Sequence, residues 1–388
     1  METTPYSIFY DIDIIKRCHH VARKNKRTKS VVVKFEMNEA DNLLQIQQQL
    51  REKTYRVGKY RNFRIYETKP RVIQALPYRD CVIQHILCDM VLMPYFERKI
   101  IHDNTACIKG RGQHYAVNRM EGFLRRFWHQ NRMEGYFLKC DIKKFFPSLS
   151  HDVIKELMSS KLADPDVRWL FDMIIDSYQA PKEFLDKHNI PQYESKFIKG
   201  VGWRKVKIPR GVPIGNQTSQ IIGVYYLNPL DRFVKEVLGV KYYIRYMDDF
   251  VLVHHDRAFL ENCLVRIREF LFKKLKIYLN DKTQIFPMKN GVKFLGQHFY
   301  LNERGQVVIK MAARTTKRFK SKVRFINKYH ECLPDDVKRS SIASYKGIFK
   351  HSNSRGKAKQ ISERCNVKIP KGKNCVKDLV MLPLEELD

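Results

Sequence analysis

Two adjacent carboxylates, Asp248 and Asp249, stand between two short runs of apolar and aromatic residues. The flanking runs, 242–246 and 250–253, have the composition of β-strands, which places the acid pair at the tip of a hairpin. Like charges held at one turn repel each other, so we expect a bound cation. Hard carboxylate oxygens favour Mg²⁺ or Mn²⁺ over zinc. An isolated acid pair is equally consistent with a solvated turn, so a second signal is needed.

The second signal is Asp141, which lies in another strand-like run, residues 138–146. A Tyr-Met-Asp-Asp sequence downstream of a strand-borne aspartate resembles the catalytic centre of reverse transcriptases. Such enzymes share one carboxylate between two metal ions and take another from a neighbouring strand. We therefore expect Asp141, Asp248 and Asp249 to be the catalytic ligands of two Mg²⁺ ions, with Mn²⁺ as a substitute. Ile142, beside Asp141, is expected at both the metal and the nucleotide.

The charge balance indicates a polyanionic partner. The chain has 388 residues, 73 Lys and Arg against 41 Asp and Glu, and a formal net charge of +32. That excess is typical of nucleic-acid binding, and the 20 Tyr and 23 Phe add surfaces for base stacking. The nine cysteines form no Cys-x-x-Cys pair, which favours reduced thiols over zinc or disulfides. We predict a cytoplasmic protein, because neither a signal peptide nor a membrane span is evident.

Candidate nucleotide contacts lie on both sides of Asp141. Lys69 and Arg71, two apart on an extended segment, point the same way and would clamp a triphosphate. The alternative is a basic strand edge facing solvent. Phe146, five residues after Asp141, would lie under the nucleotide sugar and exclude a 2′-hydroxyl. The alternative for Phe146 is a core position, which we expect for its neighbour Phe145.

Residues 210–220 supply a further part of the nucleotide site. A glycine turn that enters a helix near residue 217 would let the backbone approach the template base and the nucleotide. Ile214, Gly215 and Gln220 are the contacts expected from this segment. Lys282 would reach the leaving pyrophosphate. Ahead of this motif, residues 178–209 are polar and weakly patterned, and are expected to be a surface insertion.

Basic residues outside the acid motifs are expected to contact nucleic acid. Lys109 and Arg111 alternate with glycines in a loop that suits a phosphate backbone, although a plain helix-entry loop fits almost as well. Residues 314–330 carry seven Lys or Arg and no acid on a helical pattern. With a second helix near 338–350 they would track a duplex backbone. The expected contacts in this helix are Arg314, Lys317, Arg318, Lys320, Lys322 and Arg324.

The remaining pattern predicts an α+β chain. Residues 31–35 are expected to form a short strand, and residues 55–68 a pair of strands. In a right-hand polymerase, an antiparallel palm sheet carries the catalytic acids. The division that follows places an N-terminal extension and fingers at 1–135, a palm at 136–300, and a thumb with a tail at 301–388.

The ordered motifs resemble a reverse transcriptase over roughly residues 28–350, and more narrowly the enzyme of diversity-generating retroelements. The specific signal is Ile214-Gly-Asn-Gln-Thr-Ser-Gln220, where most reverse transcriptases have Gln-Gly-x-x-x-Ser-Pro. Segments 60–71, 245–250 and 344–353 agree with that group, whereas Gly223-Val224 departs from its usual Ala-Asn. The resemblance implies an RNA template, an RNA/DNA duplex, dNTP substrates, a small basic helical accessory oligomer and cDNA that is mutated at template adenines.

Two alternatives remain open on the sequence. One is a retron-type or phage-defence reverse transcriptase, which would use the same acids for another biological end. The other is an RNA-binding, maturase-like protein with a relic polymerase fold. The intact set of Asp141, Asp248 and Asp249 argues against the relic, and genomic neighbourhood would separate the two enzymes.

Overall fold

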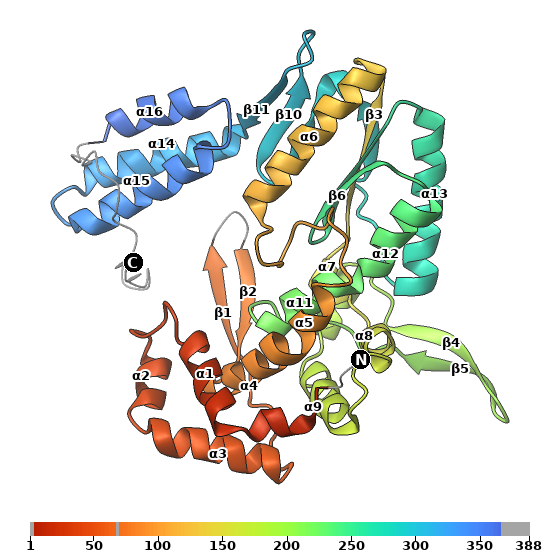
Figure 1. Cartoon of the computed structure of the whole chain (residues 1–388), viewed down its shortest axis with the longest axis vertical. Helices are drawn as coiled ribbons and strands as arrows, with labels where there is room; N and C mark the ends of the chain where they lie inside the picture. The colour runs from red at the N-terminus through yellow and green to blue at the C-terminus, as the bar shows by residue number, and fades with distance from the viewer. Residues whose placement is uncertain (1–3, 67–69, 366–388) are drawn as a thin grey trace. The chain divides into compact units, whose positions relative to one another are not determined.

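The computed structural model describes residues 4–66 and 70–365. The chain divides into two compact units. Unit 1 takes residues up to 109 together with 140–241 and 262–283, and unit 2 takes 110–139, 242–261 and the rest from 284. Strand β3 (Tyr136–Asp141) and helix α13 (Arg257–Leu275) each have residues in both units. Helices combine with antiparallel strand pairs (Figure 1), which confirms the predicted α+β class. The three-part domain division stays a prediction.

Unit 1 is mainly helical. Its helices are η1 (Tyr6–Tyr10), α1 (Ile12–Ala22), α2 (Ser30–Glu36), α3 (Glu39–Arg51), α4 (Tyr78–Ile86), η2 (Leu87–Leu92), α5 (Met93–Phe96), α7 (Phe145–Ser148), α8 (His151–Ser159), α9 (Pro165–Asp176), α10 (Lys182–Lys187), α11 (Gln217–Tyr226), α12 (Asn228–Arg232) and η3 (Phe233–Val237). Its strands form two hairpins, β1 (Arg61–Tyr66) with β2 (Pro70–Ala75) and β4 (Tyr193–Ile198) with β5 (Gly202–Lys207).

Two sequence expectations in unit 1 are wrong. Residues 31–35 form helix α2 and not a strand, because Val32 and Phe35 bury one helical face despite the β-branched run. The strand pair predicted over 55–68 lies later, as β1 and β2, with Ile65 opposite Arg71. The alternation of residue types before residue 61 does not reflect a strand. Tyr55 is buried, and its hydroxyl donates to Asp80 of helix α4 at 2.9 Å.

Unit 2 is built on a four-stranded sheet in the order β6-β7-β3-β8. These strands are β3 (Tyr136–Asp141), β6 (Tyr242–Tyr246), β7 (Asp249–His254) and β8 (Gln284–Pro287). The pairs β6–β7 and β3–β8 are antiparallel. The expected strands on both sides of the acid pair are confirmed. The strand expected over 138–146 is confirmed only up to Asp141, because helix α7 begins at Phe145.

One face of this sheet packs into the main core of unit 2. Alternate residues such as Ile244 and Val251 point into that core, while Tyr243 and Leu252 are buried on the other face. Burial on both faces explains why the strands are almost continuously apolar. The partners of the sheet are helix α6 (Gln113–Asn131) and a three-stranded sheet made of β9 (Val292–Phe294), β10 (Gln297–Leu301) and β11 (Val307–Met311).

The C-terminal part of unit 2 is a three-helix layer with its own core. Helices α14 (Ala313–Lys328), α15 (Asp335–Phe349) and α16 (Arg355–Glu363) contact one another (Figure 1). Phe319 of α14 is fully buried, and its ring stacks on Tyr345 with the centroids 4.6 Å apart. The first two helices are confirmed, whereas helix α16 was not predicted.

Candidate active site and nucleic-acid interface

The acid pair occupies the turn between β6 and β7. Tyr246 pairs with Asp249, so Met247 and Asp248 form the tip of the hairpin. Met247 has a φ of 55°, a left-handed conformation that is uncommon for a residue with a long side chain. Arg245 is completely buried, and its Nη1 donates to the Met247 carbonyl at 2.9 Å. A buried cationic donor therefore fixes the backbone of the turn that presents both carboxylates.

Strand β3 brings a third acid to this sheet. It lies between β7 and β8 in the strand order, and Asp141 is its last residue. Lys139 Nζ of β3 contacts Asp249 Oδ1 of β7 at 2.5 Å, so the end of β3 lies against the start of β7. Within unit 2, the Lys139–Asp249 ion pair thus fastens β3 to the strand that follows the acid turn, and Asp141 is the last residue of β3.

Within unit 1, Asn280 makes two hydrogen bonds to Asp141. Its side-chain Nδ2 donates to Asp141 Oδ2 at 3.1 Å, and its backbone N–H donates to the Asp141 carbonyl at 2.7 Å. Next to it, Ile142 forms an isolated bridge with Leu279. Asn280 was not predicted from the sequence. The only sequence signal for it was its position in the short connection before Lys282. The side chain of Lys282 is exposed, and its contact with pyrophosphate stays a prediction.

The two phenylalanines after Asp141 have different environments. Phe145 is 3% exposed, which confirms the expected core position, whereas Phe146 is only half-buried. Lys144, just before them, has a left-handed φ of 46° and begins helix α7. The Phe146 carbonyl accepts from the N–H of Val212 at 3.1 Å, which links α7 to the segment that carries Ile214. Phe146 is therefore free of the core environment that its neighbour occupies.

Gln74 fastens the 210–220 segment to strand β2. Its backbone N–H donates to the Ile214 carbonyl at 3.1 Å, and its side-chain Oε1 accepts from the Ile214 N–H at 2.9 Å. Gly215 follows with a φ of 120°, and a Cβ there would lie 2.8 Å from Ile73 Cγ2. Only glycine fits this approach of the two segments. Gln74 was not predicted, because a buried glutamine on a strand has no distinctive sequence signal.

The other predicted nucleotide contacts are partly placed. Arg71 lies on β2 with an exposed side chain, and Gln220 is exposed on α11. Lys69 lies outside the described residues. Lys109 is exposed at the end of unit 1, and Arg111 is half-buried in unit 2. Their expected nucleic-acid contacts stay predictions.

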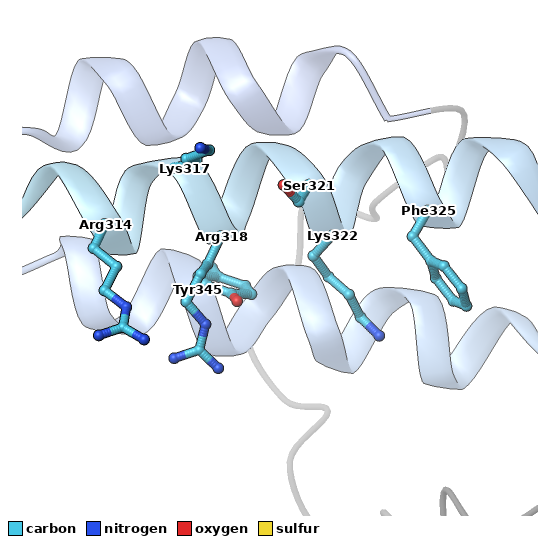
Figure 2. A pocket seen from close by; sticks show the side chains of 7 residues that line it. All are labelled: Arg314, Lys317, Arg318, Ser321, Lys322, Phe325 and Tyr345. Atoms are coloured by element: carbon cyan, nitrogen blue, oxygen red, sulfur yellow. The ribbon is translucent and has the colours of Figure 1, made fainter. Parts of the chain in front are cut away.

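A basic groove runs along helix α14 (Figure 2). It has a volume of about 690 Å³ and is lined by Arg314, Lys317, Arg318, Ser321, Lys322, Phe325 and Tyr345. Four of the six predicted thumb cations therefore line one groove. Lys320 and Arg324 are exposed but do not line it. The phenyl ring of Phe325 lies 5.1 Å from Lys322 Nζ, which gives the groove both cations and an aromatic surface.

The predicted metal ligands have the donor chemistry that Mg²⁺ and Mn²⁺ prefer. Asp248 and Asp249 of unit 2 and Asp141 of unit 1 have carboxylates, and the Ile142 backbone of unit 1 has a carbonyl. Their roles as ligands stay predictions. A different cluster within the described ranges is His19, His20 and Glu39. There Arg23 already lies 2.5 Å from Glu36 and 3.9 Å from Glu39, so a guanidinium supplies the positive charge.

Comparison with known proteins identifies the family. The sequence model of the family described as reverse transcriptase (RNA-dependent DNA polymerase) matches residues 51–299, which include all three acids. The match covers more than half of the chain, so the chain belongs to the reverse transcriptase family. Members of this family generally use divalent metal ions. No curated protein matches the chain.

Two solved telomerase structures are similar to the chain. Telomerase from Candida albicans in complex with a TWJ fragment of telomeric RNA aligns at 14% identity and a TM-score of 0.43, over 80% of this chain and 55% of that one. Apo telomerase from Candida tropicalis aligns at 13% identity and a TM-score of 0.43, over 85% of this chain and 65% of that one. The chain thus spans less than two thirds of either telomerase.

No helix within the described part of the chain is both long and apolar enough to cross a membrane.

Proposed function

We propose that the chain is an RNA-directed DNA polymerase whose chemistry is carried by Asp141, Asp248 and Asp249. The supporting observation is the ion pair between Lys139 and Asp249, which joins the strand of one acid to the turn of the other two. Bound at these oxygens, two divalent ions would activate the primer 3′-hydroxyl and stabilise charge on the transferred phosphate. The Ile142 carbonyl would complete the ligand set.

Other side chains of the centre would position the reactants. Asn280 orients the Asp141 carboxylate, and Lys139 restrains Asp249. The Gln74–Ile214 hydrogen bonds join the β2 strand, which carries Arg71, to the segment that would face the nucleotide. Arg71, Lys69 and Lys282 would neutralise the triphosphate, and Gly215 and Gln220 would approach the base pair. Template RNA and the growing RNA/DNA duplex would follow the groove on α14.

Primer extension on an RNA template tests the proposal. Asp141→Asn and Asp248→Asn should each lower Mg²⁺-dependent synthesis at least about a thousand-fold, because several kcal/mol of charge stabilisation is lost. Asp256→Asn is the matched control, since Asp256 is exposed beyond β7 and asparagine also caps the following helix. Substantial synthesis by a folded Asp141→Asn protein would contradict the assignment and favour a maturase-like RNA-binding role.

We further propose that the enzyme is of the mutagenic, diversity-generating kind, working with a small basic helical accessory oligomer. The supporting feature is the sequence Ile214–Gln220, with isoleucine where glutamine is usual. An isoleucine side chain offers only packing, so a mispaired nucleotide would lose less binding than beside a hydrogen-bonding glutamine. If the difference in binding free energy between a correct and a mispaired nucleotide falls by about 1–3 kcal/mol, the preference for the correct nucleotide falls roughly 10–200-fold.

Sequencing of cDNA made on a known RNA tests the mutagenic role, with any accessory protein present. The unmodified enzyme should misincorporate often opposite adenine, and Ile214→Gln should raise fidelity without abolishing synthesis. Equal accuracy opposite all four bases would instead favour a retron-type or defence reverse transcriptase.

A further inference from the structure

The insertion at 178–209 contains a ribbon that its sequence did not predict. Strands β4 and β5 pair antiparallel from Tyr193 opposite Lys207 to Ile198 opposite Gly202, and the ribbon projects from the helices of unit 1 (Figure 1). Gly200 and Gly202, at φ 82° and 85°, make the tip. The two strands form a sheet of their own, so one face needs support from the unit and the other can meet a ligand.

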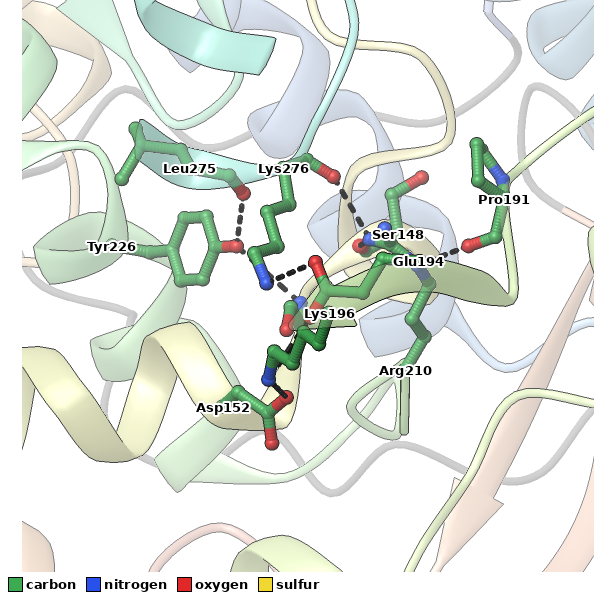
Figure 3. Close-up of polar contacts among 10 residues, drawn as sticks. Ser148, Asp152, Pro191, Glu194, Lys196, Arg210, Tyr226, Leu275 and Lys276 are labelled. Atoms are coloured by element: carbon green, nitrogen blue, oxygen red, sulfur yellow. Dashed lines mark hydrogen bonds and ion pairs between the residues drawn. The ribbon is translucent and has the colours of Figure 1, made fainter. Parts of the chain in front are cut away.

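One face of the ribbon is anchored to the unit (Figure 3). Glu194 contacts Lys276 at 2.5 Å and Lys196 at 3.0 Å, and Lys196 lies 3.8 Å from Asp152. At the base, buried Arg210 donates to the Pro191 carbonyl at 2.6 Å. The only acid of the two strands is therefore neutralised on the anchored face.

The opposite face is aromatic and basic. By strand alternation it carries Tyr193, Ser195, Phe197, Trp203, Lys205 and Lys207, and every one of these is exposed. Trp203 is 68% and Phe197 64% exposed, and their rings meet edge to face across the ribbon at 5.7 Å. Lys205 Nζ lies 4.9 Å from the Tyr193 ring. Large aromatic rings exposed together on one small face mark a binding surface.

We propose that this face binds single-stranded RNA outside the template–primer duplex. Aromatic rings stack on unpaired bases whatever their sequence, and interleaved lysines meet the phosphates. The absence of an acid from the described residues of this face makes its charge complementary to a phosphate backbone. We choose RNA as the ligand because the inference rests on the proposed function, in which the single strand that the enzyme must hold is its RNA template. An acidic protein or a second copy of the chain are the competing occupants.

The test measures the affinity of the full chain for a short unstructured RNA, for DNA of the same sequence and for a duplex. Phe197→Ala/Trp203→Ala should weaken RNA binding at least about ten-fold with little change in the salt slope. Lys205→Ala/Lys207→Ala should lower the slope by about 0.7 for each lost phosphate contact. The matched controls are Val265→Ala/Phe272→Ala for exposed apolar residues and Lys182→Ala/Lys187→Ala for charge.

Tryptophan fluorescence reports on the face directly. The chain has three tryptophans, and Trp203 is the one with a largely exposed side chain. RNA should quench the emission of Trp203, and Trp203→Phe should abolish that quenching while keeping most of the affinity, because phenylalanine still stacks. A variant that loses binding but keeps the unfolding midpoint of the parent separates lost contact from lost folding.

Loss of RNA binding at the ribbon can be distinguished from loss of the proposed polymerase activity. Primer extension on a duplex with a minimal overhang should be unchanged in the ribbon variants, whereas it is lost in Asp141→Asn. Unchanged RNA affinity in Phe197→Ala/Trp203→Ala overturns the inference. So does weakening of DNA binding alone, or a change only in oligomeric state by light scattering, which would make the face a protein interface.

Discussion

The residues that present the acids are conformationally unusual. Met247 precedes Asp248 with a φ of 55°, and Lys144 follows Asp141 by three residues with a φ of 46°. Left-handed conformations cost non-glycine residues about 1–3 kcal/mol, and they persist only where surrounding contacts over-determine them. Buried Arg245, which donates to the Met247 carbonyl, is such a contact at the turn. The strain therefore lies in the two segments next to the predicted catalytic acids.

Phe146 is expected to select the nucleotide sugar. Phe146→Val would remove the ring proposed to exclude a 2′-hydroxyl, so incorporation of ribonucleotides relative to deoxynucleotides should rise by roughly 10–200-fold, equivalent to about 1–3 kcal/mol. Single-nucleotide incorporation kinetics with dNTP and rNTP pairs measure this ratio. Phe145→Leu is the control, since Phe145 is a core residue and should change stability but not sugar selectivity. An unchanged ratio in Phe146→Val would assign Phe146 to packing alone.

At the scale of elements, Arg210 joins three segments of unit 1. Its guanidinium donates to the carbonyls of Pro191, Ser148 and Lys276 at 2.6, 2.6 and 2.9 Å (Figure 3). Burial lowers the pKa of this side chain from its ordinary value, yet the group stays charged because a guanidinium is too basic to lose its proton in a protein. The ribbon, helix α7 and the end of α13 are thus tied to one buried cation.

Arg210→Met should therefore be strongly destabilising. It leaves buried carbonyls without a donor, and we expect the free energy of unfolding to fall by about 3–5 kcal/mol. Urea unfolding followed by circular dichroism measures the change. Arg204→Met, on the exposed ribbon, is the matched control and should stay within about 0.5 kcal/mol. Equal effects of the two substitutions would mean that the three hydrogen bonds contribute little.

The α14 groove leads to a prediction with an internal control. Arg314→Ala/Arg318→Ala removes two groove cations, and Lys320→Ala/Arg324→Ala removes the same charge from positions that do not line the groove. If a duplex lies in the groove, the first pair should lower the slope of log affinity against log salt by about 2, or about 1 per contact. The second pair should change it clearly less. Fluorescence anisotropy with an RNA/DNA hybrid over a salt series measures both, and equal slopes would indicate diffuse charge attraction.

Sequence patterning predicted the elements whose burial is regular. The strands around Asp248 and Asp249 and helix α14 have clear apolar periodicities, and both were found. The β4–β5 ribbon was missed because its exposed aromatics and lysines give no core pattern. Asn280 and Gln74 were missed for another reason: each acts through hydrogen bonds to residues 139–140 positions away in sequence, which only the folded chain brings together. The acids themselves could be proposed from the sequence because the chemistry expected of them requires that residue type, and their catalytic role stays a prediction.

At the scale of the whole molecule, charge dominates. If every one of the 41 acidic residues paired with a basic one, 32 of the 73 Lys and Arg would still be unpaired. Such an excess attracts any polyanion and releases its counterions, so affinity falls steeply with salt. Specific contacts, such as stacking on Trp203, are less sensitive to salt than this background. Measurements above physiological ionic strength therefore separate the ribbon and the active site from bulk attraction.

Low pH should destabilise the chain through two buried histidines. His19 is completely buried, with Nδ1 3.0 Å from the Tyr78 hydroxyl, and His151 is 1% exposed, with Nε2 2.8 Å from the Gly211 carbonyl. Burial lowers the pKa of both, although Glu39 near His19 and Asp176 near His151 act in the opposite direction. In the unfolded chain each would titrate near its ordinary value of about 6.5.

The sign of the effect follows from proton binding. Below about pH 6.5 the two histidines bind protons in the unfolded chain but stay neutral in the folded chain. The stability that the neutral rings confer is therefore complete above that pH, and it declines as the pH falls toward the pKa of the folded state. Each histidine can contribute up to about 1.36 kcal/mol per pH unit within that window. His151→Gln keeps a side-chain donor near Gly211 but cannot titrate. Unfolding of this variant should therefore take up about 1 proton fewer, and its stability should decline less steeply as the pH falls from 7 to 5. Urea unfolding over this pH range measures the decline. A parent-like slope in His151→Gln would show that His151 titrates alike in both states.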